Sequence, residues 1–293
     1  MFIDIHVHTR RIPGFPRVGT GKTYATPQQL LERYDALGIE SAVLLPGVSP
    51  EHAHVPQSIE EVIELSHEYP GRFIPFCNID PRMLKNTADA PLGNIIAFYK
   101  DKGCKGVGEV TANLPFDHPF VLNLFHHCQQ QQMPLTFHIG HAIGGCYGLY
   151  DEPGLPLLER ALQKFPDLIF LGHSQPFWAE IAPLETEQAR KGYPKGRVEK
   201  PGRVVELMQR YPNLHGDLSA GSGHNAVSRD EEFGCWFLNE FQDRLYFGTD
   251  ICAPDTPTPL VGYLLQLRDE KKISETCFLK IARENAVRLL NLQ

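Results

Sequence analysis

The sequence predicts a closed (β/α)8 barrel, and three observations support this prediction. Short apolar runs typical of buried strands alternate with stretches of helical apolar spacing along the chain. This alternation favours a parallel sheet with helical crossovers. Eight such strands favour a barrel, a fold of about 250 residues, and the chain has 293. An open doubly wound sheet is the competing topology, but no Gly-x-Gly-x-x-Gly pattern follows the first strand.

The predicted strands are short, and most end at or near a Gly, Pro or polar residue. They span residues 2–8, 41–45, 73–78, 106–110, 135–138, 168–173, 214–217 and 245–250.

Helices are predicted between these strands from their first residues and their apolar spacing. Residues 27–34 follow Thr26 as N-cap, with Pro27 at the first helical position. Residues 58–65 carry the capping-box pattern formed by Ser58 and Glu61. Helix-compatible spacing also covers residues 119–131, 155–164, 204–211, 232–241 and 260–268.

Composition narrows the classes of partner. The net charge of −7 offers no basic face for nucleic acid or an anionic membrane. No stretch approaches the roughly 20 apolar residues of a membrane span, and no signal-peptide pattern opens the chain. Seven cysteines without a C-x-x-C pair indicate reduced thiols and a cytoplasmic protein. We therefore expect a small-molecule substrate, with a homo-oligomer left open.

A His-x-His pair ends the first predicted strand. Residues two apart on a strand point to the same face, so His6 and His8 can present both imidazoles to one metal ion. Asp4 shares their parity. The pair by itself is a weak signal, because two nearby histidines are as often structural as ligating.

Other polar residues stand at the ends of later strands: Glu109, His138, His173 and Asp250. The carboxyl ends of parallel barrel strands meet at one mouth. Histidines and carboxylates that converge there predict a metal site.

At this point the chain resembles a known family. His6-Val7-His8, His138, His173 and Phe247-Gly248-Thr249-Asp250 are similar to the metal motif of the amidohydrolase superfamily. The closest branch is the amidohydrolase-related group that includes aminocarboxymuconate-semialdehyde decarboxylase-like enzymes, whose ending resembles residues 285–290. The resemblance covers essentially the whole chain and implies a (β/α)8 barrel with a divalent metal at the strand ends.

The resemblance also implies the roles of single residues. Glu109 fits the glutamate that bridges two metals in some members, where many others carry a carboxylated lysine. His173 is then either a ligand of the second ion or, with one metal, a catalytic acid/base. Zinc is the expected metal, with manganese or iron also suited to such ligands. The ligands implied for the principal metal are His6, His8, His138 and Asp250.

The leading function is a metal-dependent hydrolase of a lactone, amide or ester. Asp250 would take a proton from a metal-activated water, and His173 would polarise the substrate oxygen. The alternative is a non-oxidative decarboxylase of an aromatic or unsaturated acid. A phosphoesterase or nuclease of the TatD type and a barrel with a purely structural metal are further readings, and the acidic charge disfavours nucleic acid.

A long insertion, residues 174–201, follows the sixth strand and lies at the predicted active-site rim. We expect a lid or specificity loop, and a surface excursion or an oligomer contact is the alternative. Within it, Trp178 and Phe177 suit either a pocket wall for substrate or packing of the lid.

Further candidates lie on loops at the same rim. His141 contacts substrate or caps a turn. Arg10 and Arg11 suit a substrate carboxylate or are surface charges. Residues 219–225 either bind a polar group through backbone N–H groups or form a Gly-rich turn before a helix capped by Ser228 or Asp230. The remaining histidines that we assign to structural or solvated positions are His52, His54, His67, His118, His126, His127 and His215.

Overall fold

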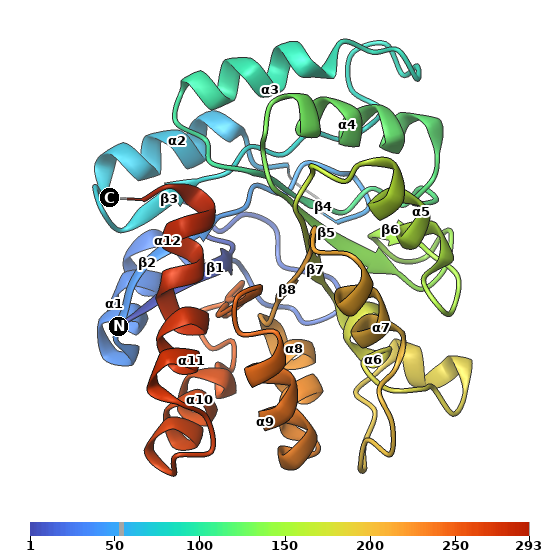
Figure 1. The fold of residues 1–293 in the computed structure, drawn as a ribbon. Coiled ribbons are helices and arrows are strands. Elements are labelled where there is room, and N and C mark those ends of the chain that lie inside the picture. The colour runs from blue at the N-terminus through green and yellow to red at the C-terminus, as the bar shows by residue number, and fades with distance from the viewer. Residues whose placement is uncertain (53–55, 293) are drawn as a thin grey trace.

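The chain folds into a parallel β-barrel surrounded by helices (Figure 1). The computed structural model describes residues 1–52 and 56–292, and His54 therefore lies outside the described residues. Eight of the described strands form the barrel: β1 (Phe2–Val7), β2 (Ile39–Leu44), β3 (Phe73–Pro75), β4 (Val107–Val110), β5 (Leu135–Gly140), β7 (Phe170–His173), β8 (Leu214–Asp217) and β9 (Leu245–Tyr246). A two-residue strand, β6 (Leu149–Tyr150), pairs with the end of β5.

The strands are hydrogen-bonded in parallel as two sheets, β1-β2-β3 and β4-β5-β7-β8-β9. Backbone bonds close both seams between them. The Cys77 amide donates to Gly106 O at 3.0 Å, which joins β3 to β4. The Ile5 amide donates to Phe247 O at 2.9 Å, which joins β1 to the chain after β9. The predicted barrel is thus confirmed, and the open doubly wound sheet is excluded.

Helices follow the strands and cover the barrel from outside (Figure 1). The longer ones are α1 (Pro27–Leu37), α2 (Ile59–Glu68), α3 (Leu92–Asp101), α4 (Pro119–Gln130), α5 (Pro156–Lys164), α7 (Arg203–Arg210), α8 (Ala220–Ser228), α9 (Glu231–Glu240) and α10 (Pro259–Asp269). The shorter ones are α6 (Gln175–Ala179), the 3₁₀ turn η1 (Glu187–Lys191), α11 (Glu275–Leu279), the π-helical turn η2 (Lys280–Glu284) and α12 (Asn285–Leu290).

The predicted helix starts are confirmed. Thr26 caps α1 in a reciprocal capping box with Gln29. The Ser58 hydroxyl accepts from the Glu61 amide at 3.1 Å, and the Glu61 carboxylate accepts from the Arg11 amide. Side chains that satisfy the free N–H groups of a first turn fix where a helix begins.

Two helices differ from the prediction. Residues 219–225 were expected as a turn or an anion-binding loop, but residues 220–228 form α8. Gly223 explains this, because a Cβ there would lie 2.2 Å from Leu218 O, and only glycine lets α8 pack so closely.

The predicted cap at Asp230 is confirmed, since its carboxylate accepts from the Phe233 amide at the start of α9.

Helix α3 was not predicted because its first turn lacks a capping side chain. Its N-cap, Pro91, makes no side-chain bond to the helix. Tertiary packing supports it instead: Leu92 and Ile96 are fully buried, and α3 lies against α4. Across the described part of the chain, every helix is too short or too polar to cross a bilayer.

Candidate active site at the carboxyl ends of the strands

The predicted polar side chains meet at one end of the barrel. His6 lies on β1 and His8 directly follows that strand, Glu109 lies on β4, His138 on β5 and His173 on β7, and all five are buried. Asp250 follows β9 in a left-handed backbone conformation (φ 53°), and its side chain is 24% exposed. This set therefore forms a buried cluster of imidazoles and carboxylates with one carboxylate open to the outside.

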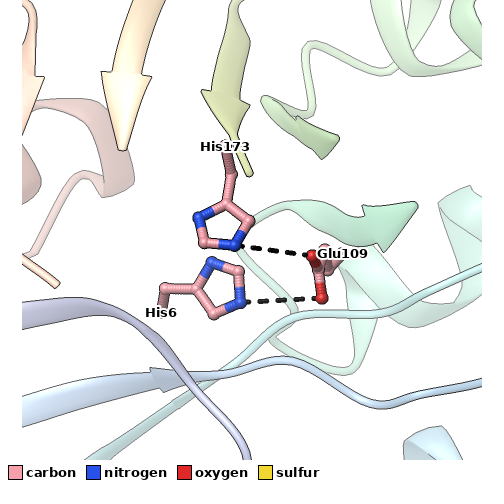
Figure 2. Close-up of side chains that lie close together, drawn as sticks. All are labelled: His6, Glu109 and His173. Atoms are coloured by element: carbon pink, nitrogen blue, oxygen red, sulfur yellow. Dashed lines mark ion pairs between the residues drawn. The ribbon is translucent and has the colours of Figure 1, made fainter. Parts of the chain in front are cut away.

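Glu109 faces four histidines, and Figure 2 shows two of them, His6 beside one carboxylate oxygen and His173 beside the other. One carboxylate oxygen, Oε2, is 3.7 Å from His6 Nε2 and 3.5 Å from His8 Nε2. The other, Oε1, is 2.6 Å from His138 Nδ1 and 3.8 Å from His173 Nε2. Each oxygen therefore faces its own pair of nitrogens.

Asp250 completes the first side of this arrangement. Its Oδ1 lies 3.7 Å from His6 Nε2 and 3.6 Å from His8 Nε2, and its Oδ2 lies 4.0 Å from His173 Nε2. Ligand atoms of His6, His8 and Asp250 lie within 4.8 Å of one another, as do those of His6, Glu109 and His173. The structure thus brings His138 next to Glu109 Oε1 rather than into the group of His6, His8 and Asp250.

The backbone around Glu109 depends on a glycine. Gly108 has φ 133°, and a Cβ at this position would lie 2.5 Å from Thr136 O on the neighbouring strand β5. Only glycine adopts this conformation at so close a strand contact without strain. Gly108 therefore allows Glu109 to point its carboxylate at the histidines.

Hydrogen bonds fix which nitrogen His6 and His8 direct at the cluster. His6 Nδ1 lies 2.6 Å from Asp217 Oδ2, and His8 Nδ1 lies 2.8 Å from Leu45 O. Both partners accept, so each ring donates from Nδ1 and directs its Nε2 inward, where the two Nε2 atoms lie only 3.2 Å apart. Two ring nitrogens this close to each other and to two carboxylates favour a cation between them, so the donor set fits a divalent metal.

The charged groups of the cluster shift one another's pKa values. Burial alone would lower the pKa of His6, but the carboxylates of Asp217 and Glu109 outweigh it and hold this pKa well above its usual value. Burial alone would raise the pKa of Glu109, but His138, His6 and His8 hold it well below. His173 is different, because burial and the neighbouring His6 lower its pKa to about 4. His173 is therefore neutral at pH 7.

Asp217 was missed in the sequence, and Ser219 was considered there only as part of the segment 219–225, through its backbone. Asp217 ends β8, is fully buried, and contacts His6 as well as His173 Nδ1, the latter at 3.5 Å. Ser219 Oγ lies 2.9 Å from the same His173 nitrogen. Asp217 stands at the end of a strand, and this is the same signal by which the other site residues were predicted.

Asp4 lies beside the site but outside the ligand cluster. Its carboxylate accepts from the Tyr34 hydroxyl at 2.6 Å, from the Thr249 amide at 2.9 Å and from the His6 amide at 3.0 Å. Asp4 thus ties β1 to the segment that carries Asp250.

Two adjoining cavities open over the cluster. The larger has a volume of about 680 Å³, and His138, His141 and Tyr147 are among its lining residues. The smaller, of about 270 Å³, is lined in part by Arg10, His52 and again Tyr147. His141 and Arg10 therefore line the space next to the cluster.

Trp178 is the site prediction that the structure corrects. It is 2% exposed and is not among the residues that line either cavity. Its indole N–H donates to Asp217 O at 2.9 Å, and its ring packs against Phe177 and Phe237. Burial of a large apolar side chain in the core stabilises the fold more than its exposure at the rim. Trp178 therefore packs in the core and holds the backbone of Asp217 through its N–H group.

Arg11 forms an ion pair with Glu68.

Of the remaining histidines, His52 is closer to the site than expected. Its ring centroid lies 5.7 Å from that of His8 and 4.7 Å from that of Tyr147. Burial lowers the pKa of His52 to about 3, so this histidine is neutral. By contrast, His118 caps α4 and His126 is exposed on it.

The fold and this cluster together define an amidohydrolase-type enzyme. The model of the family described as Amidohydrolase matches residues 3–292, and the chain therefore belongs to this family. The resemblance seen in the sequence is confirmed. No curated protein matches the sequence.

Solved structures show the same fold at low sequence identity. An uncharacterised TIM-barrel protein, Bb4693 from Bordetella bronchiseptica, has a TM-score of 0.66 and 18% identity over 99% of this chain and 98% of that one. A 2,6-dihydroxybenzoate decarboxylase from Rhizobium has a TM-score of 0.60 and 16% identity over 99% and 98%. An amidohydrolase from Burkholderia multivorans with bound zinc has a TM-score of 0.62 and 14% identity over 100% of both chains.

Proposed function

We propose that the protein is a metal-dependent hydrolase that cleaves a small polar substrate, a lactone, amide or ester, with a metal-activated water. The metal is divalent, and zinc is our assignment because His and carboxylate donors suit it and the Burkholderia relative binds it. All seven cysteines are free thiols, which supports a reducing compartment such as the cytoplasm.

The position of Glu109 carries this proposal. Each of its carboxylate oxygens faces a separate pair of histidines, His6 with His8 and His138 with His173. A carboxylate placed in this way suits a bridge between two cations, so we favour two metals per chain. His6, His8 and Asp250 would hold one metal, His138 and His173 the other, and Glu109 both.

When bound, the metal would lower the pKa of a water molecule towards about 7. The protein then has to transfer a proton from this water to the leaving group and to bind the substrate oxygen. Asp250, the most exposed member of the cluster, accepts the proton and returns it to the leaving group. Ser219 or Asp217 holds His173 at Nδ1, so its Nε2 is directed at Glu109 and would ligate the second metal. With a single metal, the same nitrogen would instead contact the substrate oxygen.

The insertion shapes the space over this cluster. Gln175, Pro176 and Lys191 from its two short helices line the larger cavity together with His141. We therefore assign the segment 174–201 to substrate selection.

A decarboxylase of an aromatic or unsaturated acid is the second candidate. The structural similarity to the Rhizobium 2,6-dihydroxybenzoate decarboxylase favours it. Release of carbon dioxide without uptake of water would separate this reaction from hydrolysis.

The proposal is tested by counting metals per chain. Elemental analysis compares wild type with Glu109→Gln, which keeps the shape of the side chain but removes its charge. The control is Glu270→Gln, at an exposed residue on the surface. We expect about two metals in wild type and in the control, and about one in Glu109→Gln. One metal in all three proteins would contradict the bridge, and wild type without metal would refute the proposed function.

A further inference from the structure

The smaller cavity contains a set of polar groups to which the proposed chemistry gives no role. Its walls come from the loop after β1 and from His52 and Tyr147. Val18, Gly19, Glu51 and Tyr147 line the larger cavity as well, so the two spaces adjoin.

Two arginines lie together in this cavity. The guanidinium carbons of Arg10 and Arg17 are 5.6 and 5.8 Å from the centroid of the same Tyr24 ring. Arg10 also donates from Nη2 to Pro56 O. Both guanidinium groups stay charged at any physiological pH, so this pairing concentrates positive charge at one wall.

No carboxylate of the described chain neutralises Arg17. Within residues 1–52 and 56–292, no ion pair joins Arg17 to an Asp or Glu inside 4.0 Å, and Lys22 in the same loop pairs with Asp255. Glu51 lines the same cavity, but its two oxygens are bonded to Arg82 at 2.7 and 2.9 Å. The charges of the Cys252 thiol and of Asp250 both raise the pKa of Arg17, and Cys252 Sγ lies 3.5 Å from Asp250 Oδ1. Arg17 is therefore a cation next to the ligand cluster without a close carboxylate partner among the described residues.

His52 adds a second, independent sign of a ligand. Its Nδ1 is buried and has no hydrogen-bond partner among the residues that the structure describes. A buried polar nitrogen without a partner costs free energy, and here it belongs to a ring that lines the cavity between His8 and Tyr147.

We infer that the smaller cavity is a binding subsite for an oxyanion of the substrate, a carboxylate or a phosphonate-like group, with Arg17 as its main ligand and Arg10 and His52 beside it. This inference rests on the proposed function, because it places the reacting bond at the Glu109 cluster and the anionic group next to it. The substrate is then an anionic molecule, and Arg17 selects it without taking part in the chemistry.

Calorimetric titration of metal-loaded protein tests the subsite with three probes of similar shape: benzoate, phenylphosphonate and the neutral benzamide. Arg17→Met removes the charge and keeps the apolar stem, while Arg11→Met is the matched control, since Arg11 pairs with Glu68 away from the cavity. We expect Arg17→Met to weaken benzoate binding at least about tenfold and Arg17→Lys to restore part of it. Benzamide binding should change less than about twofold, and the control should match wild type. The stronger of benzoate and phenylphosphonate identifies the preferred oxyanion.

Three results would overturn the subsite: wild type that binds neither anion, wild type that binds benzamide as tightly as benzoate, or Arg17→Met that binds both anions like wild type. The metal content of the same samples separates this failure from failure of the proposed function. If the samples contain the full metal content and Arg17→Met binds the anions like wild type, the subsite alone is refuted. If the protein takes up no metal but still binds anions in an Arg17-dependent way, the metal chemistry alone is refuted.

Discussion

Replacing Asp217 with Asn should loosen metal binding, although Asp217 is not itself a predicted ligand. The carboxylate lies 2.6 Å from His6 Nδ1, both groups are buried, and His6 Nε2 is thereby directed at His8 and Glu109. An amide still accepts a hydrogen bond but brings no negative charge to the imidazole. Loss of such a carboxylate behind a histidine ligand typically costs 10–100-fold in metal affinity, about 1.4–2.7 kcal/mol.

The assay is competition for zinc between the protein and a chromophoric chelator, with thermal unfolding of the same samples to confirm folding. The control is Asp243→Asn, since Asp243 is 61% exposed and pairs with Lys280 on the surface. We expect wild-type affinity for Asp243→Asn and a 10–100-fold loss for Asp217→Asn. Unchanged zinc affinity in folded Asp217→Asn would show that the contact between Asp217 and His6 does not orient the ligand.

Two further predictions concern stability. Burial lowers the pKa of His215 to about 3 in the folded protein. Between about pH 3 and 6.5, this histidine is therefore protonated in the unfolded chain but not in the folded protein. The free energy of unfolding then falls as the pH falls, by about 1.4 kcal/mol per pH unit at most. His215→Gln should flatten this acid dependence in urea titrations at pH 4–7, whereas the exposed His126→Gln should leave it unchanged; a slope equal to wild type in both would contradict the effect of burial. Because Trp178 is buried in the core, Trp178→Ala should lower the free energy of unfolding by about 3–5 kcal/mol. A loss below about 1 kcal/mol would argue for a rim position instead.

Most of the ligand cluster could be predicted because strand geometry fixes it. Residues two apart on a strand share a face, so His6 and His8 were expected side by side, and the polar residues at later strand ends indicated a metal site. Glu109 and Asp250 follow from their places at the ends of parallel strands, which must converge in a barrel. None of these inferences requires a particular loop conformation.

Loop residues are a different case. Tyr147 reaches the cluster because the chain after β5 folds back, with the Gly148 amide bonded to Thr111 O and Asn113 bonded to Gly148 O. Arg17 and His52 face the same space from two other loops. The order of residues along the chain does not encode these contacts, because each depends on where several loops pack against one another.

Asp217 shows a second limit, which concerns role rather than position. It ends a strand as Glu109 does, so its place at the barrel mouth was predictable, but its nearest partner is the outward nitrogen of His6. Whether a strand-end carboxylate contacts a metal or a ligand of the metal depends on displacements of a few ångströms in its own side chain. Sequence spacing does not resolve such distances, whereas the contacts in the structure do. Glu109 directs its two oxygens at histidine nitrogens that face the cluster, while Asp217 contacts the nitrogen of His6 that faces away from it. This difference predicts different outcomes for the two variants: a change in the number of metals for Glu109→Gln and a change in metal affinity alone for Asp217→Asn.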